Sequence, residues 1–366
     1  MELSQAFHEV VNHTMRQLKG NKKIDIKDLT LVELEGLVTS LGEKRYRARQ
    51  VMEWVYHHTI SSLEEMTNLP KEFLNRIGNI FYLSTLKAKK VKTSNDGTHK
   101  FLFELQDGNC IESVLIPEKK HLTICVSTQV GCALGCAFCL SGKNGLIRNL
   151  TPSEIVNQIC TIKHEFLPAN ELVNIVFMGM GEPLANYANT LKALHILTSP
   201  CGLNFSKRRI TVSTAGLIPE IEKLGQELPV NLAISLNAAT NSLRNSLMPI
   251  NKKYPLKKLL EVASKTPLPS RKRITFEYIL IKDINDSLKD AEKLATLLQG
   301  IRCKINLIPF NEHKDVGFKR PQGEAVEIFR QFLNAKHFSV VVRKSKGNDI
   351  LAACGQLSYV DKSRER

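Results

Sequence analysis

The sequence lacks the segments that carry a protein into or across a membrane. No stretch of its 366 residues is long and apolar enough to span a bilayer. Residues 1–20 mix charged and apolar side chains and contain no apolar core of a signal peptide. The chain also lacks internal repeats and low-complexity tracts. From these absences we expect a globular protein of the cytoplasm that does not associate with a membrane.

Acidic residues are scarce relative to basic ones. There are 36 Asp and Glu against 51 Lys and Arg, so the formal net charge is +15. Such a surplus favours a polyanionic partner, because phosphates attract the protein and binding releases counterions. A generally basic surface would give the same net charge, but the cations gather in four runs, at residues 87–92, 207–209, 271–273 and 343–346. These runs favour an RNA-binding surface, to which we expect Lys207, Arg208, Arg209 and the N-terminal helices to contribute.

The spacing of apolar residues changes along the chain. Residues 1–81 have helical periodicity and are expected to form a small basic domain, which either binds RNA or covers the larger domain. Thr30 and Glu33 have the spacing of a capping box at the start of one helix. Residues 82–121 alternate with a period near two around the turn signal Asp107-Gly108, which predicts a β-hairpin extension. Residues 358–366 are expected to form a charged tail.

Residues 122–357 alternate near-continuous apolar strands with helices. Strands are predicted at 122–126, 174–178, 209–213, 231–235, 274–280, 304–308 and 339–342. Helices are predicted between them, at 151–164, 186–197, 218–224, 256–264, 287–298 and 323–333. This order is typical of a parallel sheet covered by helices, and about six such units predict an α/β fold with a partial (β/α)6 barrel. In such barrels the site forms at the C-terminal ends of the strands.

Nine cysteines are present, an odd number, and three of them stand close together. In the cytoplasm disulfides are rare, so cysteines there more often bind metals or act in catalysis. Cys132, Cys136 and Cys139 have the spacing C-x3-C-x2-C on a loop with Gly131 and Gly135, after a predicted strand. Thiolates are soft ligands that suit iron–sulfur clusters. Three of them can hold three corners of a cubane and leave the fourth iron free for a substrate.

Two other interpretations apply to the same cysteines. A structural zinc site needs four ligands, usually in two separated pairs, and the sequence has no second C-x2-C or H-x3-H pair. A group of buried thiols without a metal is disfavoured, because three cysteines fall within eight residues on a glycine-rich loop. Four further cysteines have no motif around them and are expected to be structural: Cys110, Cys160, Cys201 and Cys303.

The cysteine loop resembles the signature of the radical S-adenosylmethionine (SAM) superfamily. The segment from Met178 to Pro183 resembles the GGEP motif of this superfamily, in which a backbone turn and a carboxylate meet the amino group of SAM. The resemblance implies a [4Fe–4S] cluster on the three clustered cysteines, with SAM as the second cofactor. Several residues at successive predicted strand ends are expected to bind SAM together: Gly181, Glu182, Ser213, Ser235, Leu236, Asn237 and Asn311.

Longer strings are similar to the RlmN/Cfr family of RNA adenosine methyltransferases. Over roughly residues 100–357, the strings CVSTQVGCALGCAFC, FMGMGEPL, RRITVSTAGLIP, LMPINKKYPL and ILAACGQL follow one another as in that family. Pro183 and the string KINLIP look more like the RlmN branch. Asn237 stands where the family has His, and Leu140-Ser141 where it usually has Ser or Ala followed by Thr. Asparagine still forms hydrogen bonds, so we expect altered SAM contacts rather than lost function.

The resemblance implies methylation of an adenosine C2 carbon in 23S rRNA, with tRNA as a further substrate. Because this carbon is electron-poor, the family uses two SAM molecules per turnover, one to methylate a cysteine and one to yield the radical that activates this methyl group. On the family's pattern, Cys354 carries the methyl group and Glu112 accepts the C2 proton from the protein–RNA adduct. Cys125 then attacks the Cys354 sulfur and leaves a disulfide bond. We also expect a flavodoxin- or ferredoxin-type electron donor and a monomeric enzyme.

Other functions stay open at the level of sequence. A C8-adenosine rRNA methyltransferase of the Cfr type would differ in the atom that it modifies. A non-catalytic iron–sulfur protein that binds RNA would need neither Cys125 nor Cys354, so the presence of both argues against it. A radical SAM activase or peptide-modifying enzyme is disfavoured by the basic charge and by the family motifs.

Overall fold

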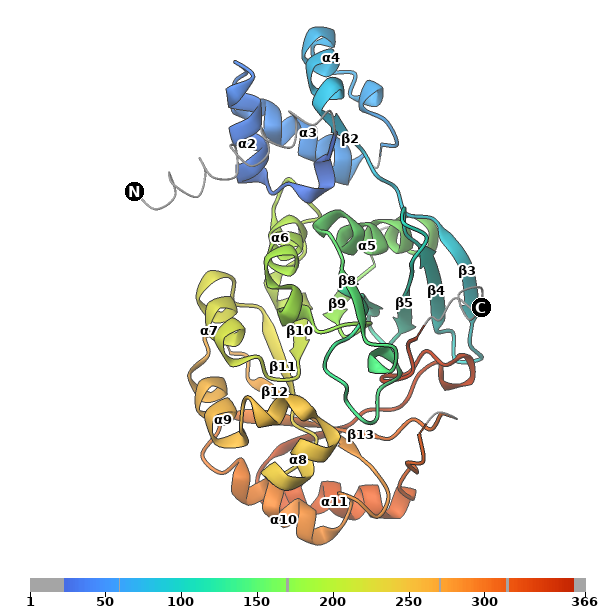
Figure 1. The fold of residues 1–366 in the computed structure, drawn as a ribbon, viewed down its shortest axis with the longest axis vertical. Coiled ribbons are helices and arrows are strands. Elements are labelled where there is room, and N and C mark those ends of the chain that lie inside the picture. The colour runs from blue at the N-terminus through green and yellow to red at the C-terminus, as the bar shows by residue number, and fades with distance from the viewer. Residues whose placement is uncertain (1–22, 59, 169–170, 270, 314–315, 359–366) are drawn as a thin grey trace. The chain divides into compact units, whose positions relative to one another are not determined.

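The computed structural model describes residues 23–58, 60–168, 171–269, 271–313 and 316–358 (Figure 1). The chain forms two compact units. The first combines the N-terminal part, up to residue 87, with residues 150–169 and 188–206, and the second holds residues 88–149, 170–187 and the chain from 207 onward. The helical character predicted for residues 1–22 and the charged tail predicted beyond Ser358 lie outside the described residues. The predicted division at residues 81, 121 and 357 stays a prediction.

The first unit is mainly helical. It contains α2 (Leu31–Ser40), α3 (Tyr46–His57), α4 (Lys71–Ile80), α5 (Pro152–Phe166), most of α6 (Tyr187–Thr198) and a parallel pair of short strands, β1 (Ile24–Asp25) and β2 (Phe81–Tyr82). The predicted capping box of α2 is confirmed, since Thr30 and Glu33 each accept from the other's amide. Lys27 Nζ donates to Asn157 Oδ1 at 2.7 Å, which fastens α5 to the chain that precedes α2. Two helices that stand between barrel strands in sequence thus belong to the helical unit.

Within the described residues, the second unit is built on a sheet of ten strands in the order β14-β13-β12-β11-β10-β9-β6-β5-β4-β3. The strands from β6 to β14 in this sheet run parallel: β6 (Leu122–Cys125), β9 (Val173–Phe177), β10 (Ile210–Thr214), β11 (Asn231–Ser235), β12 (Ile274–Leu280), β13 (Cys303–Pro309) and β14 (Ser339–Val342). Along the chain, five helices of this unit alternate with the strands from β10 onward: α7 (Ile218–Glu227), α8 (Asn241–Leu247), α9 (Leu256–Lys265), α10 (Leu288–Leu297) and α11 (Gly323–Ala335). The predicted α/β partial barrel is confirmed.

One face of the central strands is apolar and buried. Ile175, Val212, Ile234, Phe276 and Ile305 all point to this face, because the strand pairing aligns them in register, and each is almost completely buried. The bounds of β11, β12 and β14 are those predicted from the sequence. Because parallel strands end at one edge, the segments that follow them meet there.

Three antiparallel strands extend the sheet beyond β6. The predicted hairpin consists of β4 (His99–Glu104) and β5 (Cys110–Pro117), and it turns at Gly108, whose φ is +79°. The outermost strand, β3 (Ala88–Thr93), is largely exposed and rich in lysine. A charged edge strand of this kind discourages pairing with other chains. No helix in the described ranges is long and apolar enough to cross a membrane.

Candidate active site

A closed loop after β6 carries the three clustered cysteines. The short strands β7 (Gln129–Gly131) and β8 (Leu146–Asn149) pair antiparallel and bring the two ends of this loop together. The Cys132 amide donates to the Gly145 carbonyl at 2.9 Å. Gly131 has a φ of +78°, and a Cβ there would lie 2.1 Å from the same carbonyl oxygen. Only glycine fits this position, so protein contacts alone close the loop.

The three thiols of this loop lie near one another in apolar surroundings. Cys132, Cys136 and Cys139 are half-buried and interact electrostatically with one another. Burial raises the pKa of Cys132 to about 11 and raises the pKa of the other two thiols as well. Cys136 and Cys139 pack against a group of apolar side chains, among them Phe138, Leu247, Met248, Ile281 and Phe310. Such a surround limits the access of water to a bound group.

These donors fit a [4Fe–4S] cluster better than a single ion. Among the residues that the structure describes, no three His, Cys, Asp or Glu side chains are placed to hold one metal ion. A cubane requires a different arrangement, because each thiolate binds a different iron atom. Three soft thiols on one closed loop, within an apolar surround, meet this requirement.

The turn after β9 carries the segment predicted to bind SAM. Gly181 has a φ of +96°, and a Cβ there would lie 2.5 Å from the side chain of Gln129. The Met180 carbonyl accepts from the amides of Thr128 and Gln129 at 2.9 and 3.2 Å. The turn is therefore held directly against the start of the cysteine loop, and glycine at position 181 allows this close approach.

Glu182 links the ends of two neighbouring strands. Its carboxylate accepts from the amides of Leu184 at 3.1 Å and Ala215 at 2.8 Å, so it joins the segment after β9 to the end of β10. The side chain is almost completely buried, and burial raises its pKa to about 7. It also interacts electrostatically with Cys132 and Cys136. The carboxylate predicted to meet SAM thus lies beside the cysteine loop and already has two backbone partners.

The other residues predicted to bind SAM differ in their surroundings. Ser213 and Ser235 are half-buried at the ends of β10 and β11, and Ser213 Oγ donates to Glu277 Oε2 at 2.7 Å. Leu236 and Asn237 are buried. Asn237 has a φ of +58°, which asparagine tolerates better than most residues. Its Oδ1 accepts from a backbone amide of β12 at 2.9 Å, so its side chain is used within the protein.

A buried arginine that the sequence did not single out organises the same edge. Arg244 Nη2 donates to the carbonyls of Ala215 and Ser235, at 2.7 and 3.0 Å. Its Nε donates to the Leu236 carbonyl and its Nη1 to Asn251 Oδ1, both at 3.0 Å. Arg244 is completely buried, and burial lowers its pKa to about 10. It thereby fixes the ends of β10 and β11 on which the predicted SAM residues lie.

Two of the cysteines outside the cluster motif, the predicted methyl carrier and the predicted resolving cysteine, line one small cavity. Cys125 and Cys354 share it with Asn311 and Arg343, and both cysteines are free thiols. Burial, with a further contribution from Cys354, raises the pKa of Cys125 to about 12. Asn311 Nδ2 donates to the Cys354 carbonyl at 3.2 Å. Arg343 lies close to both sulfurs, and Cys354 is the main cause of the raised pKa of its guanidinium. The structure therefore brings together two thiols that are far apart in sequence.

Glu112, on β5, lies on the same face of the sheet as the cavity. Val114 lines the cavity and pairs with Cys125 across the strands, and Glu112 is two residues before Val114 on the same strand. Residues two apart on a strand point to the same face. Glu112 is buried and forms an ion pair of 2.9 Å with Lys100. Burial raises the pKa of this carboxyl, against the opposing effect of Lys100.

Residues 345–358, here called the carrier segment, hold Cys354 beside the cysteine loop. The Gly355 carbonyl accepts from the Leu140 amide at 2.8 Å. Ser141 Oγ donates to the Leu357 carbonyl at 2.6 Å. Cys139 and Cys354 also interact electrostatically. The predicted cluster ligands and the predicted methyl carrier are thus neighbours.

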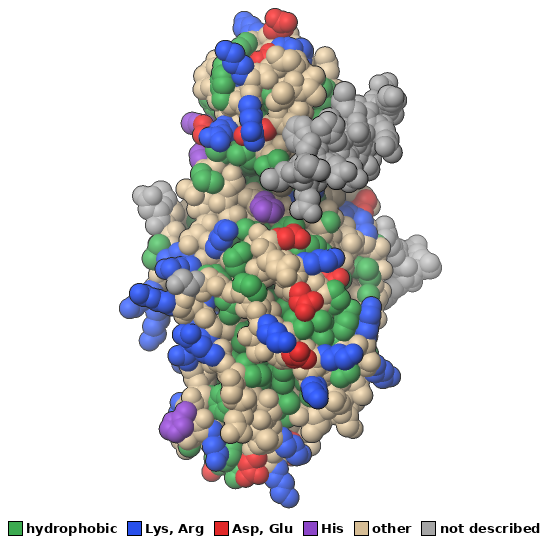
Figure 2. Space-filling model, turned by 90° about the vertical axis from the view of Figure 1, so that its left-hand side faces the viewer, with side chains coloured by type: hydrophobic (Ala, Val, Ile, Leu, Met, Phe, Trp, Pro, Cys, Tyr) green, Lys and Arg blue, Asp and Glu red, His purple; other side chains and the backbone are tan. Residues whose placement is uncertain are grey.

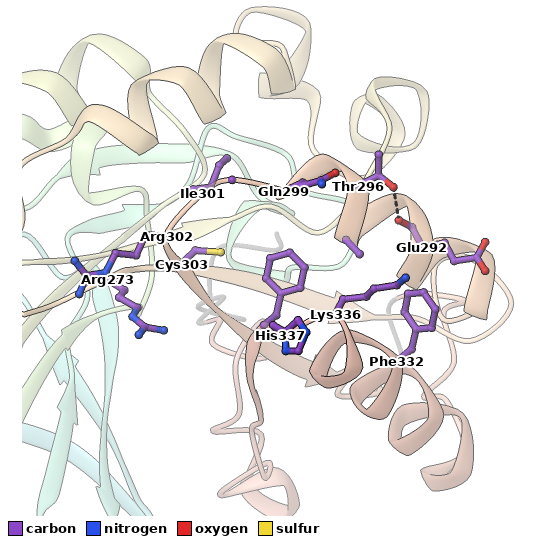
Figure 3. A pocket seen from close by; sticks show the side chains of 13 residues that line it. Arg273, Glu292, Thr296, Gln299, Ile301, Arg302, Cys303, Phe332, Lys336 and His337 are labelled. Carbon is purple, nitrogen blue, oxygen red and sulfur yellow. Dashed lines mark hydrogen bonds between the residues drawn. The ribbon is translucent and has the colours of Figure 1, made fainter.

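A separate cavity of about 620 Å³ opens at the other end of the strands. It lies beside the first residues of β12 and β13, and Figure 3 shows Arg273 and Arg302 close together on one side of it. Lys336, which follows α11, lies across the cavity near Phe332. None of the residues predicted to bind SAM or the cluster lines this cavity.

The fold and the closed thiol loop define a radical SAM enzyme. A family model of the radical SAM superfamily matches residues 126–296. A crystal structure of a radical SAM methyltransferase from Sphaerobacter thermophilus matches with a TM-score of 0.84 and 43% identity, over 91% of this chain and 99% of that one. Membership of this superfamily implies a [4Fe–4S] cluster and SAM as cofactors, as predicted from the sequence.

Similarity over nearly the whole chain narrows the class to a family. Residues 24–83 match the ribosomal RNA large subunit methyltransferase N-terminal domain. The chain is 51% identical to the dual-specificity RNA methyltransferase RlmN of Geotalea uraniireducens, over 92% of this chain and 97% of that protein. It is 52% identical to RlmN of Geobacter sulfurreducens, over 91% and 92% of the two chains. The chain therefore belongs to the RlmN family.

Proposed function

We propose that this protein methylates C2 of an adenosine in RNA, in the cytoplasm, with 23S rRNA and tRNA as substrates. The proposal rests above all on the pair of Cys125 and Cys354 in one cavity beside the cysteine loop. A protein that only bound RNA would not need two further thiols next to the site of the iron–sulfur cluster. The relatives named dual-specificity RNA methyltransferases support the same reaction.

The methyl group would pass through Cys354. The cluster and SAM, when bound, would supply the methyl group and the one-electron steps that join it to the base. Cys354 would hold the methyl carbon through a sulfur–carbon bond, so that protein and RNA are covalently joined for part of the cycle. A carbon held on a side chain is already oriented toward the base, which removes much of the entropic cost of the reaction.

Glu112 and Cys125 would then release the RNA. Glu112 takes the proton from C2 as a general base. The Cys125 thiolate attacks the Cys354 sulfur, a disulfide forms, and the electron pair of the broken sulfur–carbon bond goes to the carbon, which takes a proton and remains as the methyl group. Arg343 opposes the effect of burial on the pKa of Cys125 and so favours its thiolate. A cellular dithiol would reduce the disulfide before the next turnover.

The N-terminal ends of the barrel strands, at the edge opposite the thiol cavity, offer an additional contact surface for a long RNA. Arg209 precedes β10, Arg273 precedes β12 and Lys304 lies at the start of β13. Besides burial, the positive charges of Lys304, Arg208 and Arg209 lower the pKa of Lys272, so two basic runs of the sequence lie close together here. The cavity of Figure 3 adjoins this edge, and Glu292 is the single acidic residue of its lining. A cationic edge of this kind attracts the phosphates of RNA.

The wider surface is compatible with a large polyanionic substrate. On the face drawn in Figure 2, Lys and Arg side chains are spread widely and acidic side chains are fewer. We further propose that the protein works as a monomer and receives electrons from a flavodoxin- or ferredoxin-type donor.

A reconstituted reaction tests the proposed function. The protein would be loaded anaerobically with iron and sulfide and given SAM, dithionite and an rRNA fragment. We expect 5′-deoxyadenosine together with 2-methyladenosine, and we expect Cys354→Ala to make no methylated base. Formation of 8-methyladenosine instead would identify the C8 reaction, and a fully loaded protein that makes neither product would contradict an enzymatic role.

A further inference from the structure

A buried ion pair lies beside the thiol cavity, and its lysine, Lys100, has no part in the mechanism so far. Lys100 lies on β4 and Glu112 on β5, and their Nζ and Oε1 atoms are 2.9 Å apart. The two side chains are only 9% and 7% exposed. Lysine is almost never buried to this extent without a partner, because its ammonium loses its hydration. The position therefore demands a specific charged partner, and Glu112 supplies it.

The same ammonium also contacts the carrier segment. Lys100 Nζ donates to the Leu351 carbonyl at 3.1 Å, three residues before Cys354. The second carboxylate oxygen of Glu112 accepts from the Ser358 amide at 3.0 Å. The ion pair thus contacts the chain on both sides of Cys354. Any displacement of the pair would move the cysteine relative to the carboxylate.

The turn between β3 and β4 strengthens this attachment. The Asp96 carboxylate accepts from the Gly347 amide at 3.0 Å. Ser94 Oγ donates to Asp349 Oδ1 at 2.5 Å. The hairpin that carries Lys100 therefore holds the carrier segment at several points before Cys354.

We propose that Lys100 is a positioning residue that keeps Glu112 ionised and holds it in a fixed place relative to Cys354. The inference rests on the proposed function, in which Glu112 accepts the C2 proton. Its physical basis is the cost of a buried carboxylate without a partner, which would take up a proton and lose its function as a base.

The charges around Glu112 support this role. Burial acts to raise the pKa of Glu112, whereas Lys100, the Ser358 amide and, more weakly, Lys92 act to lower it. Lys92 is exposed on β3 and is screened by water, so Lys100 is the cation that works at short range. After Glu112 takes the C2 proton, the buried pair carries a net positive charge. This charge favours release of the proton and so restores the carboxylate.

Replacement of Lys100 by methionine separates this role from a merely structural one. We expect Lys100→Met to form 5′-deoxyadenosine, to accumulate the covalent protein–RNA adduct, and to make about 100-fold less 2-methyladenosine at neutral pH, since general-base catalysis contributes at least this factor. Raising the pH should restore product, because Glu112 without its cation ionises only at higher pH. The matched control is Lys89→Met, which removes an exposed lysine paired with Glu104 on the neighbouring strand. It should leave the pH profile unchanged.

Two further variants keep the test decisive. Lys100→Arg retains the charge and should retain the wild-type pH profile, so a shifted profile in this variant would overturn the inference. In the double variant Lys100→Met, Glu112→Gln, higher pH should not restore product, because no carboxyl remains to ionise. Wild-type yield from Lys100→Met at neutral pH would also overturn the inference. If the wild-type protein itself makes no 2-methyladenosine, the proposed function fails rather than the role of Lys100.

Discussion

Among single residues, Arg244 makes the clearest contribution to stability. Its guanidinium donates to three carbonyls at the ends of β10 and β11 and to the side-chain oxygen of Asn251. Replacement by methionine would leave these acceptors buried without partners. We expect Arg244→Met to lower the free energy of unfolding by about 3 kcal/mol, in the range measured for broken buried polar networks. Urea denaturation measures this change.

The control for Arg244 is an exposed cation of the same unit. Lys258→Met, on α9, should change the free energy of unfolding by less than about 0.5 kcal/mol, as most surface substitutions do. A loss below about 1 kcal/mol in Arg244→Met would show that the strand ends hold together without the guanidinium.

The different roles proposed for Cys125 and Cys354 give a second prediction for single residues. In the proposed mechanism the Cys125 sulfur resolves the adduct between Cys354 and RNA, so Cys125→Ala should accumulate a covalent protein–RNA species. Denaturing gel electrophoresis with labelled RNA detects it. Cys303→Ala, at the far end of the barrel, is the matched control and should release its RNA as the wild type does. Release of methylated RNA by Cys125→Ala at the wild-type rate would assign resolution to another group.

The sequence predicts those site residues that stand in a recognisable motif and misses those that stand alone. The cluster cysteines, Cys125 and Cys354 have motif spacing around them, and the structure places the latter two in one cavity. Arg244 and Lys100 have no such pattern, because an isolated cation in a sequence reads as a surface residue. Their burial follows from contacts with carbonyls and carboxylates distant in sequence, which no local pattern records.

Among the elements, the β7–β8 ribbon has a testable role in holding the cluster. Gly131 and Gly108 both have a positive φ, but a Cβ at Gly131 would collide with the Gly145 carbonyl, whereas Gly108 has nothing within 4 Å. We expect Gly131→Ala to open the cysteine loop and to bind much less iron after reconstitution. Gly108→Ala should lower the free energy of unfolding only by the strain of a positive φ, roughly 1 kcal/mol, and the variant should bind iron normally. Equal iron content in the two variants would contradict the role of the ribbon.

The strands were predictable and the small elements were not. β11 and β12 consist mostly of apolar residues between polar segments, so their bounds follow from the sequence. β7 and β8 are short and are held by one loop closure rather than by an apolar pattern. The place of α5 and α6 in the helical unit could not be read from the order of elements, because both have the position of barrel helices in the chain. Their partners, such as Lys27 for Asn157, are remote in sequence.

For the whole molecule, the proposed RNA surface predicts a change in salt dependence. Each phosphate contact adds about 0.7–0.9 to the slope of the logarithm of the RNA affinity against the logarithm of salt concentration. Replacement of Lys272, Arg273 and Lys304 by glutamine should therefore reduce the slope by about 2–3. Filter binding or fluorescence anisotropy over a range of salt concentrations measures it.

A control with the same change of charge isolates the surface. Lys257, Lys258 and Lys265 lie on α9, and their replacement by glutamine also removes three positive charges. We expect this variant to keep most of the wild-type slope. If the two triple variants weaken RNA binding equally, net charge rather than the cationic edge sets the affinity. If the edge variant keeps its affinity for RNA but loses reduction by an acidic electron-transfer protein, the edge serves that protein instead.

The attachment of the carrier segment to the β3–β4 hairpin also sets the order in which the thiol site can assemble. Asp96 with Gly347 and Lys100 with Leu351 are each 251 residues apart, and Glu112 with Ser358 are 246 apart. Bringing together residues so far apart in an unfolded chain has an entropic cost. This cost is smaller once the barrel between them has folded, because the folded barrel already holds the two ends close to each other. The sulfurs of Cys125 and Cys354 should therefore meet only as a late step of folding. In an earlier folding intermediate the two sulfurs are still apart, so a disulfide bond between Cys125 and Cys354 cannot form before the barrel has folded.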